Sequence, residues 1–281
     1  MRLFKAFATL MLAAVTLFSI TAQAAEPQLS VQLWSVKDEL KADFKGTLQS
    51  LADMGFDGVE FAGDFGPYAN DPAGLKAFLA EIGLVASGAH VGMDKMTAEK
   101  LMQTAAFYLA LGAPTLVVPW DDRAMQADGI DEMVSELTRV SEALRPYGLK
   151  TGYHNHAPEF EPYKDGTFWD YLASNTPQDV VLQLDVGWAT AAGKEAAVYI
   201  RKYPGRTYTT HIKAGMPEGT KGKQPIIGKD IADWPVILDA LYEVGGTHWL
   251  VVEQEVYPKG MTPMQSVKAS LKGLQGYLAK R

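Results

Sequence analysis

The chain of 281 residues contains no cysteine. It therefore forms no disulfide bond and offers no site for a lipid-modified cysteine, so an oxidising compartment would be tolerated without supplying cross-links. The sequence also lacks any Pro/Gly/Ser-rich tract, charge block or low-complexity segment that would mark a linker. These absences favour one folded domain over two small ones.

Positive charge is scarce, because 26 Lys and Arg residues oppose 33 Asp and Glu residues, a formal net charge of −7. An acidic surface repels the phosphate backbone of DNA and RNA, so we expect no nucleic-acid partner. The sequence also shows no arginine cluster that would hold a phosphate group. A neutral small molecule suits this charge balance better.

The N-terminal residues have the pattern of a secretory signal peptide. Arg2 and Lys5 precede a mostly apolar stretch at residues 6–20, and a small-x-small sequence, AQA, follows at residues 22–24. The apolar stretch is short for a membrane span, which needs about 20 residues. We therefore favour a cleaved signal peptide at residues 1–24 over a membrane anchor.

Cleavage would remove two basic residues and no acidic ones, which leaves 24 Lys and Arg against 33 Asp and Glu, a formal charge of −9. The remaining residues 25–281 match the roughly 250 residues of one (β/α)8 barrel. We expect a single TIM-barrel domain at residues 25–281. The mature protein would be periplasmic or secreted, without stable membrane insertion.

Strand-like and helix-like segments alternate eight times, which predicts a parallel sheet with covering helices. The predicted strands are residues 29–35, 58–63, 84–90, 115–120, 149–154, 180–186, 207–213 and 248–253. Apolar residues recur at helical spacing between them, as in the stripes Phe44-Leu48-Leu51, Met133-Leu137-Val140-Leu144 and Val267-Leu271-Leu274-Leu278. Glycines that we expect to end helices in the left-handed conformation are Gly55, Gly83, Gly112, Gly148 and Gly245. Eight units favour closure into a barrel over an open doubly wound sheet, and no G-x-G-x-x-G turn follows the first strand.

Four residues of metal-ligand type lie at or near the ends of the last four predicted strands: His154, Asp185, His211 and Glu253. A parallel barrel gathers the carboxyl ends of its strands on one face, so these side chains would meet. Each residue taken alone is explained as a buried, hydrogen-bonded polar group, but four together predict one divalent metal site. Two imidazoles and two carboxylates suit Mn, Zn, Fe, Co or Mg.

Strand periodicity places further polar residues beside this site. His156 shares the parity of His154, so either histidine is a candidate ligand, and the other would act as a base or as a hydrogen-bond donor to a ligand, unless His156 faces solvent from a loop. Glu253 lies deeper in its apolar run than Glu255, so we prefer Glu253 as the ligand. Lys213 would stabilise a developing enolate oxygen or form a salt bridge to an inner carboxylate.

Five residues near strand ends are candidates for substrate binding. Glu60 and His90 end the second and third strands and would either hydrogen-bond the hydroxyl groups of a ligand or have a structural role. Aromatic faces suit sugar rings but are also common as packing at a barrel rim. The aromatic candidates are Trp34, Trp120 and Trp188.

Six segments resemble the sugar phosphate isomerase/epimerase family, the xylose isomerase-like TIM barrels. They are GFDGVEFAG, YHNHAPEF, LDVGWATAAGK, YPGRTYTTHIKAG, IGKDIADWPVIL and VVEQE. The resemblance implies one divalent metal held at the ends of strands five to eight, with Asp185, His211 and Glu253 at matching positions.

Two departures separate the chain from the related ketose 3-epimerases. His154 stands where they have a Glu that serves as ligand and acid/base, and Trp188 stands where they have a substrate-binding His. The YHNH segment looks nearer to inosose dehydratase-like proteins and lyases that act on 3-keto-glycosides. The family's DNA-repair branch uses a basic groove, which the acidic charge argues against.

These observations predict an exported, metal-dependent isomerase or lyase that acts on a sugar or keto-sugar. His156 or Glu253 would remove the proton next to a carbonyl, and Lys213 would support the charge that develops. Loss of the second Glu favours β-elimination or hydration over isomerisation. The alternatives are a non-catalytic carbohydrate-binding barrel and metal-assisted hydrolysis.

Overall fold

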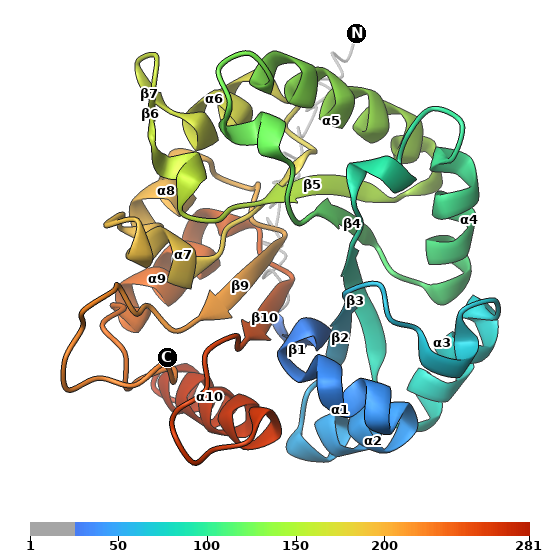
Figure 1. Ribbon diagram of the computed structural model, residues 1–281, viewed down its shortest axis with the longest axis vertical. Coiled ribbons are helices and arrows are strands. Elements are labelled where there is room, and N and C mark those ends of the chain that lie inside the picture. The colour runs from blue at the N-terminus through green and yellow to red at the C-terminus, as the bar shows by residue number, and fades with distance from the viewer. Residues whose placement is uncertain (1–25) are drawn as a thin grey trace, which may run out of the picture.

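The protein is described by a computed structural model over residues 26–281 (Figure 1). The predicted signal peptide at residues 1–24 lies outside the described residues and stays a prediction. None of the helices in the described part is long and apolar enough to cross a membrane.

Eight parallel strands form a nearly closed barrel, with helices ringed around it (Figure 1). The strands are β1 (Gln28–Gln32), β2 (Gly58–Phe61), β3 (Val85–His90), β4 (Thr115–Val118), β5 (Lys150–His154), β8 (Val181–Gln183), β9 (Thr209–Lys213) and β10 (Trp249–Glu253). Each lies within or close to one of the eight predicted segments, so the predicted (β/α)8 architecture is confirmed.

Backbone hydrogen bonding around the barrel is sparsest between β8 and β9, which form no continuous ladder in the described residues. The two strands are joined by an isolated parallel bridge between Asp185 and His211, in which the His211 amide donates to the Leu184 carbonyl at 3.0 Å. A second hydrogen bond, from the Leu182 amide to the Arg206 carbonyl at 2.8 Å, lies at the start of the same seam. Two predicted metal ligands therefore lie on opposite sides of this seam.

The helices follow the apolar stripes of the sequence. They are α1 (Lys37–Ala42), α2 (Phe44–Met54), α3 (Pro72–Glu81), α4 (Leu101–Leu111), α5 (Ile130–Leu144), α6 (Phe168–Asn175), α7 (Val186–Ala191), α8 (Ala196–Lys202), α9 (Trp234–Ala240) and α10 (Pro263–Leu278). The three predicted stripes lie on α2, α5 and α10, and all of their residues are buried except Leu278, which is partly buried. Side-chain oxygens of Asp43, Asp71 and Asp233 accept amide hydrogen bonds at the starts of α2, α3 and α9.

Five glycines were predicted to end helices in the left-handed conformation, and the prediction is wrong for Gly245. It ends a π-helical turn (Leu241–Gly245) and is buried, whereas its neighbour Gly246 has φ of 65° and ends the helix. The π turn holds one more residue than an α turn, so the cap shifts by one position. The other four have φ between 72° and 95°.

Between β5 and α6 the chain forms a short antiparallel hairpin of β6 (Pro162–Tyr163) and β7 (Gly166–Thr167), which the sequence did not predict. Short 3-10 turns follow several strands, among them η1 (Leu33–Val36), η2 (Gly66–Tyr68), η3 (Met93–Lys95) and η6 (Pro158–Phe160). These turns carry side chains over the carboxyl ends of the strands, where the predicted site lies.

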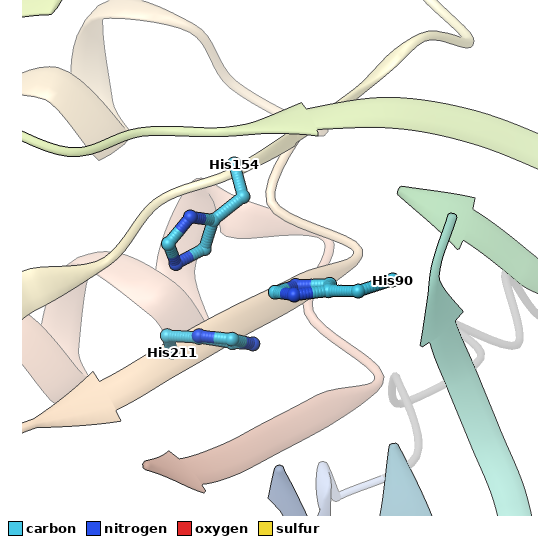
Figure 2. A group of neighbouring side chains, drawn as sticks. All are labelled: His90, His154 and His211. Carbon is cyan, nitrogen blue, oxygen red and sulfur yellow. The ribbon is translucent and has the colours of Figure 1, made fainter. Parts of the chain in front are cut away.

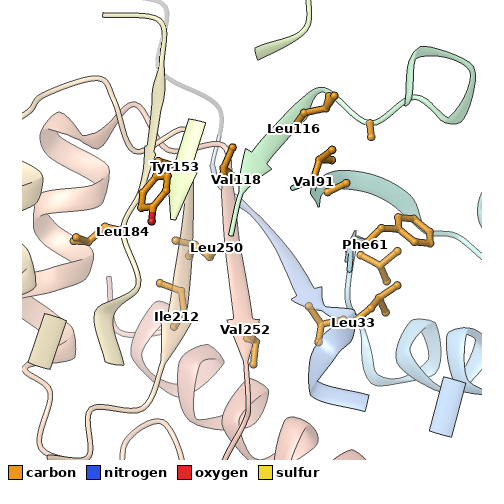
Figure 3. Close-up of a cluster of buried hydrophobic side chains, with 14 of the residues drawn as sticks. Leu33, Phe61, Val91, Leu116, Val118, Tyr153, Leu184, Ile212, Leu250 and Val252 are labelled. Atoms are coloured by element: carbon orange, nitrogen blue, oxygen red, sulfur yellow. The ribbon is translucent and has the colours of Figure 1, made fainter. Parts of the chain in front are cut away.

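The main hydrophobic core lies between the barrel and the helices (Figure 3). Alternate strand residues such as Phe61, Ile212 and Leu250 face this layer, as strand periodicity requires. Their neighbours Glu60 and His211 are equally buried but polar. The polar interior is therefore the part of the barrel that needs a functional explanation.

Candidate metal centre and substrate cavity

The four residues predicted to bind a metal come together at the carboxyl end of the barrel. One ligand atom from each of His154, Asp185, His211 and Glu253 lies within 4.8 Å of the others. All four side chains are buried, with exposed fractions of 5% or less. The structure therefore contains a cluster that could hold a divalent ion, and we call these four residues the ligand cluster.

The two carboxylate oxygens of Asp185 have different surroundings. Its Oδ1 atom accepts a hydrogen bond from the Trp188 amide at 2.7 Å and so begins helix α7. Its own amide donates to Oδ1 of Asn155 at 2.8 Å, which fixes the backbone here. The Oδ2 atom is buried and has no hydrogen-bond partner in the described residues. Sequence reasoning missed Asn155, whose role depends on a contact 30 residues away.

His154 has both ring nitrogens buried without a hydrogen-bond partner in the described part of the chain. Its Nε2 atom lies 3.4 Å from Oδ2 of Asp185. Burial and the nearby charges of His211 and His90 hold the pKa of His154 well below its ordinary value, so the ring is neutral. A neutral imidazole nitrogen and a carboxylate oxygen that face each other without a hydrogen bond are costly when buried, and a cation between them would remove that cost.

The spacing of the ligand cluster suits such a cation. Ligand atoms about 2.0–2.2 Å from a metal ion lie roughly 3–4 Å from one another. Oδ2 of Asp185 lies 3.8 Å from Nδ1 of His211, which lies 3.1 Å from Oε2 of Glu253. The donor set of two nitrogens and two carboxylates therefore fits a divalent ion, and the ion's identity stays open among the predicted metals.

His211 lies between two carboxylates. Its Nδ1 atom faces Glu253, and its Nε2 atom lies 2.6 Å from Oε1 of Glu60. Burial opposes protonation of His211, but the charges of Glu253 and Glu60 outweigh it and raise the pKa of His211 to about 10. Without a metal the ring is thus an imidazolium, and a metal at Nδ1 would replace a proton there.

Glu60 lies beneath the ligand cluster, fully buried. Its two oxygens accept hydrogen bonds from the Nε2 atoms of Gln32 and Gln183, each at 2.7 Å, as well as from His211. Burial would raise the pKa of Glu60, but His211 and His90 hold it below its ordinary value. Glu60 is not among the residues that line the large cavity described below. Contact with a substrate stays a prediction, whereas the contact with His211 is observed.

His90 completes a group of three imidazoles with His154 and His211 (Figure 2). The ring centroids of His90 and His211 lie 5.1 Å apart in a stacked arrangement, and His154 meets both rings edge-on. Nε2 of His90 lies 2.7 Å from Oε1 of Gln183, whose amide nitrogen donates to Glu60, so His90 carries its proton on Nε2. The three histidines could also hold an ion, but they supply no negative charge.

His156 lies next to the ligand cluster, not in solvent. Its ring centroid is 4.9 Å from that of His154, 4.8 Å from that of Trp120 and 5.2 Å from that of Trp188. Burial and the charge of Lys213 lower its pKa to about 4, so His156 is neutral at neutral pH. Its Nδ1 atom is buried without a partner in the described residues.

Glu159, which sequence reasoning missed, fixes the segment that carries His156. It accepts hydrogen bonds from the His156 amide at 2.8 Å and from the Tyr153 hydroxyl at 2.9 Å. Burial raises the pKa of this carboxyl group. Because Glu159 follows a proline in a 3-10 turn, neither helical nor strand periodicity could place it inward.

Lys213 lies among carboxylates and next to an aromatic ring. Its Nζ atom is 3.5 Å from Oε2 of Glu253 and 3.7 Å from Oδ2 of Asp185, and it bonds Glu255. It also lies 4.4 Å from the ring centroid of Trp188. The predicted salt bridge to an inner carboxylate is thus present. Glu255, which the sequence made the less favoured ligand, pairs with Lys213.

A cavity of about 920 Å³ opens above the cluster. At this end its lining includes His154, His156 and Glu253, with Trp34 and Trp120 each 45% exposed at the mouth. The other predicted aromatic, Trp188, is partly buried against His156. The cavity is close to the upper end of the roughly 300–1,000 Å³ range of small-molecule sites.

Comparison with known proteins adds to this geometry. The family described as xylose isomerase-like TIM barrel matches residues 48–277. An inosose dehydratase of Lacticaseibacillus casei is 22% identical over 260 residues, which cover 79% of this chain and 85% of that protein.

Solved structures share the fold. A sugar phosphate isomerase/epimerase from Parabacteroides distasonis ATCC 8503 superposes with a TM-score of 0.74 and 24% identity, covering 91% of this chain and 98% of that one. A probable 3-DHS dehydratase involved in petrobactin synthesis from Bacillus anthracis has a TM-score of 0.67 and 13% identity, covering 88% and 98%. At these identities the likeness concerns the barrel alone.

Proposed function

Because the chain belongs to the xylose isomerase-like TIM barrel family, we propose that it is a divalent-metal-dependent enzyme that removes the proton next to the carbonyl group of a sugar or keto-sugar. The observation that carries this proposal is the ligand cluster. In it, Nε2 of His154 and Oδ2 of Asp185 are buried without a hydrogen-bond partner within the described residues, 3.4 Å apart.

His154, Asp185, His211 and Glu253 would hold the ion, which when bound supplies Lewis acidity that polarises a carbonyl group and lowers the pKa of the neighbouring C–H bond. Lys213 and His211 hold the pKa of Glu253 well below its ordinary value against the effect of burial. Glu253 is therefore an anionic ligand, with its charge shared between the ion site and Lys213.

His156 is the better candidate for the base. It is neutral at neutral pH, lines the cavity and is adjacent to the ligand cluster. Its neighbour Lys213 is an ammonium ion that can stabilise an oxygen as negative charge develops on it. Trp120 and Trp188 flank the His156 ring and limit its movement.

The reaction that we favour over isomerisation is elimination of a β-substituent or the reverse reaction, hydration of a double bond. Epimerisation would reprotonate the carbon on its opposite face and so requires a second acid/base group. His154 stands at the position where the related ketose 3-epimerases have a glutamate. The similarity to an inosose dehydratase supports the same choice.

The experiment is solvent-deuterium incorporation. Purified protein loaded with Mn²⁺, Co²⁺ or Zn²⁺ is incubated in D₂O with a panel of keto-sugars and 3-keto-glycosides. We expect exchange at the carbon next to the carbonyl, with an unsaturated product from substrates that carry a leaving group. Solvent oxygen in the product without carbon-bound exchange would instead indicate hydrolysis, and binding without exchange or product would indicate a non-catalytic carbohydrate-binding barrel.

Export is also part of the proposal, and it rests on residues 1–24. Cell fractionation of a tagged full-length chain would find the protein, shortened by the leader, in the periplasm or medium. A variant with Arg2 and Lys5 replaced by Glu would be retained uncleaved.

A further inference from the structure

The cavity has a second end that differs chemically from the ligand cluster. Away from the histidines it is lined by Phe65, which precedes turn η2, and by Phe107 and Tyr108 of helix α4. Ala62 and Ala69 contribute further apolar surface. We call these five residues the aromatic arm. None of them is needed to hold an ion or move a proton.

The aromatic arm is built as a wall of rings. The centroids of Phe65 and Phe107 lie 4.8 Å apart with their planes inclined at 62°, and Phe107 meets Tyr108 edge-on at 5.3 Å. Phe65 also stacks on Phe61 of β2 at 5.3 Å, which ties the wall to the barrel. Phe65 and Phe107 are only partly buried, so part of each ring faces the cavity.

Several polar groups at this end contact one another. The ammonium group of Lys100 donates to the Asp94 carbonyl at 3.0 Å, and the Thr104 hydroxyl donates to the Lys95 carbonyl at 2.7 Å. Lys95 itself pairs with the Asp94 carboxylate at 3.4 Å. Gln103 also lines the cavity, and the side chains of Lys95 and Asp94 are exposed, so polar groups border this end without covering the aromatic rings. The rings themselves offer no hydrogen bonds, so they suit an apolar ring better than a sugar ring.

We propose that the aromatic arm binds an apolar, planar ring attached to the sugar, so that the substrate is a ring-substituted glycoside and not a free monosaccharide. This inference rests on the proposed function, because the sugar part must lie at the ligand cluster. The two ends belong to one cavity of about 920 Å³, which is more space than one sugar ring requires. Edge-on rings such as Phe65 and Phe107 favour contact with another ring.

The test compares two glucosides that carry no keto group and are therefore not consumed. Binding of phenyl β-D-glucoside and methyl β-D-glucoside to the metal-loaded protein is measured by calorimetry. We expect roughly tenfold tighter binding of the phenyl compound. In Phe107→Ala this preference falls to about twofold or less, and in Phe107→Leu, which keeps apolar volume but no ring, it is intermediate.

Leu109→Ala is the matched control. Leu109 lies on the same helix, is 38% exposed and does not line the cavity, so its loss leaves the phenyl preference unchanged. Equal affinities of the two glucosides for the parent protein, no measurable binding of either, or the same loss of preference in Leu109→Ala would each overturn the proposal.

The outcomes also separate this inference from the proposed function. If keto-sugars undergo deuterium exchange but the protein does not bind the phenyl glucoside more tightly, the aromatic arm is not a binding site and the proposed reaction is retained. If the phenyl glucoside binds more tightly and Phe107→Ala abolishes this preference, but no keto-sugar undergoes exchange, the aromatic arm is a binding site and the proposed proton removal is wrong.

Discussion

Nε2 of His211 lies 2.6 Å from Oε1 of Glu60, on the side of the ring opposite the nitrogen that faces Glu253. A carboxylate that accepts the second N–H of a metal-binding histidine fixes the ring's tautomer and raises its basicity. Glu60 is therefore in place to orient His211 toward the ion.

Glu60→Gln should weaken metal binding about 10–100-fold. Glutamine offers one acceptor oxygen where Gln32, Gln183 and His211 all donate, so the His211 ring loses its fixed orientation. Metal affinity is measured by competition with a chromophoric chelator. Glu243→Gln, on the exposed side of the protein, is the control, and equal affinities of both variants would remove Glu60 from this role.

Asp185→Asn should abolish stoichiometric metal while the barrel stays folded. Asparagine still caps helix α7, but the second carboxylate oxygen, which would bind the ion, is lost. The readouts are metal content by mass spectrometry and the far-UV circular dichroism spectrum. Asp233→Asn changes the equivalent capping residue of α9, remote from the cluster, and should retain the metal. Full metal content in Asp185→Asn would contradict the ligand assignment.

His156→Gln should keep the metal and lose deuterium exchange by about 10²–10⁴-fold, the usual contribution of a general base. His248→Gln provides a control, because His248 is a histidine stacked on Tyr208 at 4.3 Å, outside the site. An exchange rate near that of the parent would mean that the base lies elsewhere.

Lys213→Met distinguishes the two roles predicted for this lysine. If the ammonium group stabilises developing charge, turnover falls about 10²–10³-fold while metal is retained, because removing one cation lowers repulsion of the ion. If Lys213 only pairs with Glu255 and Glu253, turnover stays within a few-fold and stability falls. Lys202→Met removes an ion pair with Asp170 and controls for a lost salt bridge.

Metal binding should release protons in a pH-dependent way. His211, with a pKa of about 10 in the metal-free protein, must lose its proton, and burial raises the pKa of Asp185 to about 7. Apparent affinity should rise about tenfold per pH unit between pH 7 and 10, more steeply below pH 7, and level off above pH 10.

Calorimetry at pH 8 in two buffers of different ionisation enthalpy measures this release directly. About one proton per metal is expected at that pH. No release at pH 8 would show that Nδ1 of His211 is not a ligand.

The barrel and the ligand cluster were predictable because both follow from periodicity. In β9 the period of two residues places Thr209, His211 and Lys213 on one face, and parallel strands then bring their ends together. The prediction needed only the strand order of a closed barrel, which the structure confirms.

The residues that the sequence did not reveal act through loops and long-range contacts. Asn155 and Glu159 belong to a segment in which backbone direction is set by hydrogen bonds to Asp185 and Tyr153. Phe107 and Tyr108 lie in a helix whose apolar residues are indistinguishable from core residues by spacing alone. Their place beside a cavity depends on how α4 lies against turn η3 and the loop that carries Phe65.

The seam between β8 and β9 gives the proposed ion a second consequence. Asp185 and His211 form the isolated bridge there, so an ion shared by their side chains would cross-link the cylinder where its backbone pairing is sparsest. At a free-ion concentration 100 times the dissociation constant, binding adds about 2.7 kcal/mol to the stability of the folded protein. Removal of the ion by a chelator would therefore lower the melting temperature. Amide hydrogen exchange would accelerate first at the residues that pair β8 with β9.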